Sequence, residues 1–307
     1  MNIKSEQLFT NVYPTNTIGK IIQFPISRIL ISVLFIIPFL FLHNKIIGDM
    51  IAATNEPLHS FLTYIDTIGS VIAIFFFYLL YVKYIERRKC YELSLNNSAK
   101  EFSIGFIISL CLVGAMVLLM VVLGFYKVVD INPVKVIIDG FFFFGIGALI
   151  QEIFFRIIVF RLTEELLGSW IAFIVISIIF GFFHILNTNA SIWTSIGLML
   201  SDILLTAAFI YTRRIWMVWA LHMSWNFFQD GIFGMPNSGI TEFPSWIVSE
   251  ISGAKWITGG SFGIEASYIA IFMSLLVGMI IFKRAIQKNQ IVKPLWVRIK
   301  NITAVST

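Results

Sequence analysis

Runs of about 20 apolar residues follow one another along this chain, and each is long enough to cross a bilayer as an α-helix. Polar or turn-rich stretches separate them. The runs cover residues 24–43, 62–83, 103–126, 135–161, 168–186, 193–212, 215–233 and 263–283. Only 13% of the 307 residues are charged, whereas a soluble domain carries roughly 25%. The sequence therefore predicts an all-α fold, a polytopic integral membrane bundle of about eight transmembrane helices.

The Lys and Arg residues are distributed unevenly over the segments between these runs. With a cytoplasmic N-terminus, 17 of the 22 fall in inner segments and four in outer ones, while Arg156 lies inside a span. Positive residues favour cytoplasmic loops, so both termini are predicted to be cytoplasmic. The net charge of +5 is then explained by membrane topology, and no nucleic-acid partner is expected. Usage rich in Ile, Phe, Lys and Asn suggests a bacterium with an AT-rich genome, so the expected location is a bacterial plasma membrane.

Three of the predicted spans contain polar side chains that are costly at membrane depth. They are Glu152 and Arg156 in the fourth span, His184 in the fifth, and His222 and Asn226 in the seventh. An ionisable residue there costs at least about 2.5–3.5 kcal/mol on insertion scales, so it indicates function by default. Both pairs have i,i+4 spacing and therefore share a helix face.

These side chains have several uses that spacing alone does not separate. They can form a general base, an oxyanion donor and a positioned water in a dry cavity. Glu152, His184 and His222 can ligate zinc if they converge. They can also be packing residues, interhelical hydrogen bonds or a proton relay in a transporter. At 1.5 Å per residue, His184 is expected about 22 Å from the inner end of its span, a turn or more further out than the others.

The three segments together resemble the CAAX protease and bacteriocin-processing family of intramembrane proteases. That family shows EExxxR on one helix, FxxxH on the next and HxxxN on a later one. Residues 151–156, 180–184 and 222–226 fit these blocks in order and spacing. The resemblance implies an intramembrane endopeptidase, classed with metalloendopeptidases, that acts on membrane-associated peptides such as prenylated tails or leaders. Its partners would be that substrate and the lipid bilayer. No cofactor is certain, and zinc is the one to test.

The resemblance also assigns roles to the residues and divides the chain. The first Glu of EExxxR would activate the water, while His184, His222 and Asn226 would position the substrate or stabilise the oxyanion. Residues 135–232 would be the catalytic core. Residues 1–134 would form an N-terminal membrane region with three helices. Residues 233–307 would supply an outer loop, the last transmembrane helix and a basic cytoplasmic tail.

The chain departs from the family at the water-activating position, where Gln151 replaces the first Glu. A neutral amide can hold a water by hydrogen bonds but cannot take its proton. Either Glu152 takes over as base, or the chain is a pseudoenzyme that binds substrates or confers bacteriocin self-immunity, or the Gln is peculiar to this chain. Because Glu152 lies about 100° around the helix from Gln151, it is expected to face Arg156.

Four further acidic positions are weaker candidates. Glu164 and Glu165 are expected at a solvated helix end. Asp202 is expected either to line the cavity or to hydrogen-bond between helices. Glu265 is expected to cap or pack the start of the last helix.

Overall fold

The computed structural model describes residues 3–10, 14–55, 57–240 and 243–298, with the side chains of 37–44 excepted. Twelve α-helices are found in these residues. They are α1 Thr17–Gln23, α2 Pro25–His43, α3 Asp49–Ala52, α4 Leu58–Tyr81, α5 Ser98–Val122, α6 Lys135–Glu152, α7 Arg161–Leu167, α8 Ser169–Phe183, α9 Ile192–Thr212, α10 Ile215–Asn226, α11 Lys255–Thr258 and α12 Tyr268–Gln287. The predicted helical membrane fold is confirmed.

The number of helices that can span a membrane is smaller than eight in the described part of the chain. Six are long and apolar enough, and a seventh is formed if α1 and the start of α2, which meet at a bend of 71°, count as one span. The bend arises because Phe24 is extended before Pro25, as the residue before a proline usually is. The predicted seventh span, 215–233, is the short helix α10 followed by a π-helical segment.

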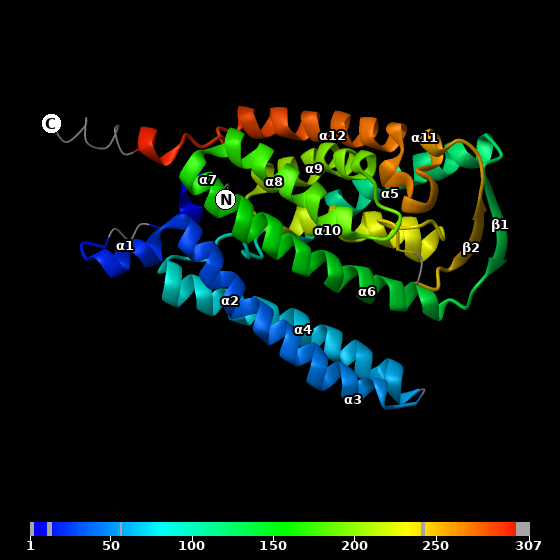
Figure 1. Ribbon diagram of the computed structural model, residues 1–307, viewed down its shortest axis with the longest axis horizontal. Helices are drawn as coiled ribbons and strands as arrows, with labels where there is room; N and C mark the ends of the chain where they lie inside the picture. Colours follow the sequence, from blue (N-terminus) through cyan, green and yellow to red (C-terminus); the bar gives the residue numbers. More distant parts are fainter. Residues whose placement is uncertain (1–2, 11–13, 56, 241–242, 299–307) are drawn as a thin grey trace.

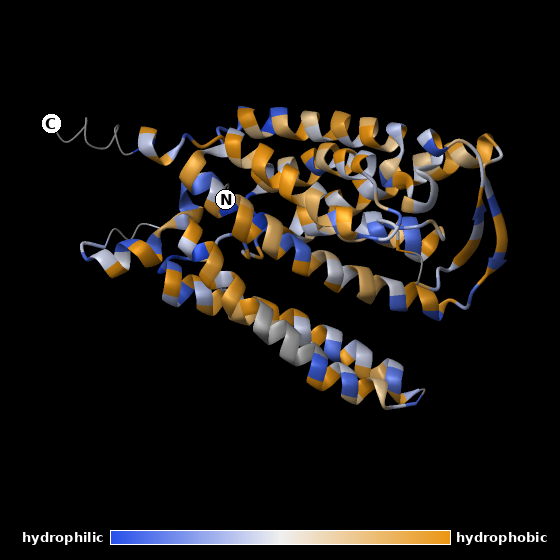
Figure 2. Cartoon of the chain, viewed as in Figure 1, coloured by the Kyte–Doolittle hydropathy of each residue, from blue (hydrophilic) through white to orange (hydrophobic). Residues whose placement is uncertain are grey.

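Helices α9 and α10 lie at the centre of the bundle (Figure 1). Helix α9 packs against α12, α8 and α10, and α10 packs against α5 and α6. Helices α2 and α4 form a pair along one edge and diverge from α6 (Figure 1). Hydrophobic residues run along the long helices, while hydrophilic ones gather mainly at helix ends and connections (Figure 2). This distribution fits a lipid-embedded bundle.

One end of the bundle carries a two-stranded antiparallel sheet, which an all-α prediction misses. Strand β1, Tyr126–Ile131, pairs with β2, Ile247–Ile251, in the register Tyr126↔Ile251 and Ile131↔Ile247. The sheet ties the connection between α5 and α6 to the long segment that follows α10. The Tyr126 hydroxyl also donates to the Phe233 carbonyl, 2.7 Å away.

A buried ionic cluster lies at the other end and joins α2, the segment that follows α4, and the start of α7. The carboxylate of Glu86 contacts Arg28 at 3.2 Å, Arg161 at 2.6 Å and Arg88 at 2.7 Å. Glu86, Arg28 and Arg161 are fully buried. The cluster attaches the α2–α4 pair to the rest of the bundle.

The expectation that Glu164 and Glu165 are solvated is wrong. Glu164 is fully buried and accepts from Arg213 Nη1 at 2.5 Å, and Glu165 is 5% exposed and pairs with Arg28 at 2.5 Å. Arg213 and Arg28 come from distant parts of the sequence, so neither partner is visible in the local pattern. The Glu pair holds segments together.

Candidate active site

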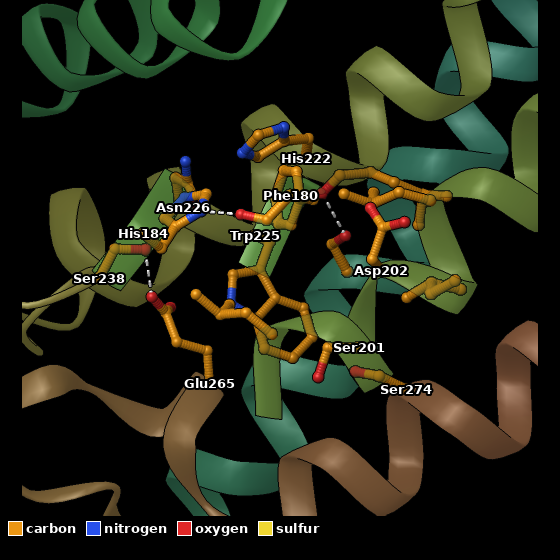
Figure 3. Close-up of a pocket in the computed structure, with 15 residues that line it drawn as sticks. Phe180, His184, Ser201, Asp202, His222, Trp225, Asn226, Ser238, Glu265 and Ser274 are labelled. Carbon is orange, nitrogen blue, oxygen red and sulfur yellow. Dashed lines mark hydrogen bonds between the residues drawn. The ribbon is translucent and has the colours of Figure 1, made fainter. Parts of the chain in front are cut away.

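A small cavity of about 60 Å³ lies among α8, α9 and α10. One water needs roughly 10–15 Å³ of such space, so the cavity can hold a few. His184, His222 and Asn226 line it together with Asp202, Trp225, Ser238 and Glu265 (Figure 3). Three predicted site residues therefore come together. His184, expected too far out, joins the others because the cavity lies where α8 ends, at Phe183.

His222 is fixed by Glu152 behind it. Its Nδ1 lies 2.6 Å from Glu152 Oε1, and the two residues are 7% and 0% exposed. A carboxylate only accepts, so in the neutral imidazole Nδ1 carries the proton and Nε2 keeps its lone pair. An imidazole that a carboxylate orients in this way can serve as a general base.

Arg156 neutralises the carboxylates around this pair. Its Nε lies 3.2 Å from Glu152 Oε2, a charge contact without hydrogen-bond geometry, and its Nη2 bonds Asp202. Asp202 also accepts from Ser177 at 3.0 Å and Thr206 at 2.8 Å. Asp202 thus both lines the cavity and bridges helices, the two alternatives that the sequence left open.

His184 is oriented by its own helix. Its Nδ1 lies 2.7 Å from the Phe180 carbonyl oxygen. The centroids of the His184 and Phe180 rings are 4.6 Å apart. A carbonyl also only accepts, so Nδ1 is again the donor and Nε2 has the free lone pair. The Phe180 ring in turn lies 5.2 Å from the guanidinium carbon of Arg156. One aromatic side chain therefore contacts both His184 and Arg156.

Two helices change from α-helical to π-helical geometry next to the site residues. Helix α6 passes into a π-helical segment directly after Glu152, and α10 does so directly after Asn226. Such segments interrupt the regular helical register and are frequent at functional sites. Here they end the two helices that supply Glu152, His222 and Asn226.

Gln151 lines a different cavity. This second space, about 290 Å³, lies beside the α2–α4 pair and is walled mainly by apolar side chains, including Ile74 and Phe183. Gln151 and Glu152 are neighbours on α6 and point about 100° apart. The side chain that matches the family's water-activating residue thus lines the apolar cavity, whereas its neighbour supports His222.

Glu265 and Ser238 also line the cavity, a position that the sequence analysis did not predict for either residue. Ser267, not Glu265, caps α12, since its hydroxyl accepts from Ala270 N at 3.1 Å. Of the two expected roles, capping is therefore wrong, whereas packing agrees with the burial of Glu265, which is 5% exposed. The sequence offered one signal of a role in the cavity, namely a carboxylate among apolar residues in the stretch 262–266.

The Glu/His/His zinc set does not fit this arrangement. Among the described residues, no group of three His, Cys, Asp or Glu side chains could hold a metal ion. The Glu152 oxygens face His222 and Arg156, so Glu152 orients an imidazole. Metal analysis of the purified protein, with a His222→Ala control, tests zinc dependence.

Comparison with protein-family models matches residues 133–228 to a family described as Rce1-like, type II CAAX prenyl endopeptidase Rce1-like. The matched range includes all six predicted site residues, namely Gln151, Glu152, Arg156, His184, His222 and Asn226. Comparisons with curated proteins and with solved structures found no match. Residues 133–228 therefore match an Rce1-like domain, which supports the resemblance of the chain to the CAAX protease and bacteriocin-processing family.

Proposed function

We propose that the protein is an intramembrane endopeptidase that hydrolyses a peptide bond of a membrane-associated peptide, such as a prenylated tail or a leader. The observation that supports this most strongly is the 2.6 Å contact between Glu152 and His222 at the wall of the cavity. It leaves one imidazole nitrogen available beside His184 and Asn226. The charge distribution supports both termini in the cytoplasm.

In the proposed reaction, His222 Nε2 takes a proton from water while the water oxygen adds to the scissile carbonyl. Glu152 stabilises the imidazolium that forms and keeps the ring in place. His184 Nε2 accepts a hydrogen bond from the same water and helps to hold it. Asn226 donates its amide N–H to the oxyanion. Phe180, Leu198 and Leu221 wall the cavity and exclude bulk water, which strengthens these interactions.

Hydrolysis is tested with the purified chain in nanodiscs and a panel of quenched fluorescent peptides, some prenylated. Wild type is compared with Glu152→Gln, which keeps the size of the side chain and removes its charge. Cleavage by wild type that falls at least about 100-fold in Glu152→Gln would support the proposal. Absence of cleavage in both, with prenylated peptides still bound, would instead favour a non-catalytic binding protein.

Restoring the family's carboxylate at position 151 tests the pseudoenzyme alternative. Since Gln151 lines the apolar cavity and not the one with His222, we expect Gln151→Glu to change kcat/KM by no more than about threefold. That is about 0.7 kcal/mol in transition-state energy. Turnover that appears only in Gln151→Glu would show that the natural chain lacks its base.

The role of Asn226 is tested by separating kcat from KM. Loss of one oxyanion donor typically lowers kcat by about 10²–10³, so Asn226→Ala is expected to do the same with little change in KM. Ser201→Ala, another residue of the cavity wall, serves as control. A variant with raised KM and unchanged kcat would mean that Asn226 only binds substrate.

A further inference from the structure

The cavity contains a carboxyl group that lies outside the family match. Glu265 is on the turn between α11 and α12, across the cavity from α10, and is 5% exposed. The Ser238 hydroxyl donates to its Oε1 (Figure 3). The matched residues end at 228, so the family match assigns no role to either residue.

Glu265 differs from the other carboxylates near the cavity in its charge environment. Glu152 and Asp202 share Arg156, whereas no Lys or Arg pairs with Glu265 in the part of the chain that the structure describes. Burial raises the pKa of Glu265, which precedes the α12 span, and hydrogen bonds from Ser238 and Gln229 oppose the rise. A buried carboxyl without a cation favours the neutral, proton-donating form.

The backbone around Glu265 is built for close approach to the segment that carries Ser238. Gly263 has a φ of 115°, and a Cβ there would lie 2.0 Å from the Pro236 carbonyl oxygen and 2.6 Å from Gln229 Nε2. Only glycine fits such a contact at this φ. The close packing holds Glu265 against Ser238 at the cavity.

We propose that Glu265 is the general acid of this site and protonates the leaving amine. The inference rests on the proposed endopeptidase function. It assigns base and acid to two groups whose surroundings favour opposite protonation states, a pairing that acid–base enzymes use repeatedly.

The step balances as follows. Water gives one proton to His222 Nε2, and its oxygen forms the new bond to the carbonyl carbon. As the C–N bond breaks, its electron pair stays on nitrogen and takes the proton of Glu265. The products are an acid and an amine. Transfer of the proton from His222 to the Glu265 carboxylate through a cavity water restores both groups.

The test compares two otherwise identical peptides, one with a scissile amide and one with a scissile thioester. An amide nitrogen must be protonated to leave, while a thiolate, with a thiol pKa of about 8.5, leaves without a proton. We expect Glu265→Gln to lower amide cleavage by about 100-fold or more and thioester cleavage by less than about threefold. Glu250→Gln, an exposed carboxylate on β2, is the matched control.

The outcomes separate this inference from the function on which it rests. Equal losses on both substrates would show a structural role for Glu265, and unchanged amide cleavage would show that His222 returns the proton itself. Either result overturns the assignment while leaving the endopeptidase intact. A wild-type protein that cleaves neither substrate overturns both proposals.

Discussion

Replacing His222 with Ala is expected to lower kcat for peptide cleavage by about 10²–10⁴, the range typical of a lost general base. The variant removes the only imidazole that Glu152 supports within the described chain, and it leaves that carboxylate without its donor. His184 does not substitute, because its Nδ1 donates to a neutral group, the Phe180 carbonyl, and not to a carboxylate. Single-turnover kinetics with a quenched peptide measure the loss without contribution from product release.

Two controls belong to this prediction. His59→Ala, at the start of α4 and away from the cavity, is expected to retain wild-type kcat. Glu152→Gln should also lower kcat, because the amide lacks the charge that stabilises the His222 imidazolium. Activity of His222→Ala within threefold of wild type would contradict the role of the imidazole.

Replacing Glu86 with Gln is expected to destabilise the folded protein by about 3–5 kcal/mol, the typical result of breaking a buried ion pair. Glu86 faces three guanidinium groups, those of Arg28, Arg88 and Arg161. The neutral amide keeps the shape of the side chain but leaves those buried cations short of one negative charge. Reversible unfolding of the protein from mixed micelles with increasing SDS measures the change.

The matched control is Glu250→Gln, because Glu250 is exposed on β2. A surface substitution of this kind usually changes stability by less than about 0.5 kcal/mol. If Glu86→Gln were as mild as the control, the cluster would not be what attaches the α2–α4 pair to the bundle.

The sequence predicted the elements that depend on local pattern. Apolar run length placed α8 and α9 nearly correctly, and i,i+4 spacing predicted the contact between Glu152 and Arg156. The order of the motifs also predicted that His184 and His222 share one site, and both line the same cavity. Helix length and the Glu152–Arg156 contact are decided within a few turns of helix, where rise and periodicity are fixed.

The long-range pairings were beyond such reasoning. Helices that are apolar on every side give little indication of their rotation, so the contacts of Glu152 with His222 and of Arg156 with Asp202 were not predictable. Glu265 stands in a turn, whose path depends on the packing of Gly263 against a distant segment. The strands were missed because β1 is short and pairs with a segment over a hundred residues away.

The central claim is that a water in this cavity, activated by His222, adds to a peptide carbonyl. Cleavage in water enriched in oxygen-18, followed by mass spectrometry of the fragments, tests it most directly. The expected result is one heavy oxygen in the new C-terminal carboxylate with wild type, and almost no product with His222→Ala. Unlabelled fragments, or labelled ones formed equally well by His222→Ala, would contradict the claim.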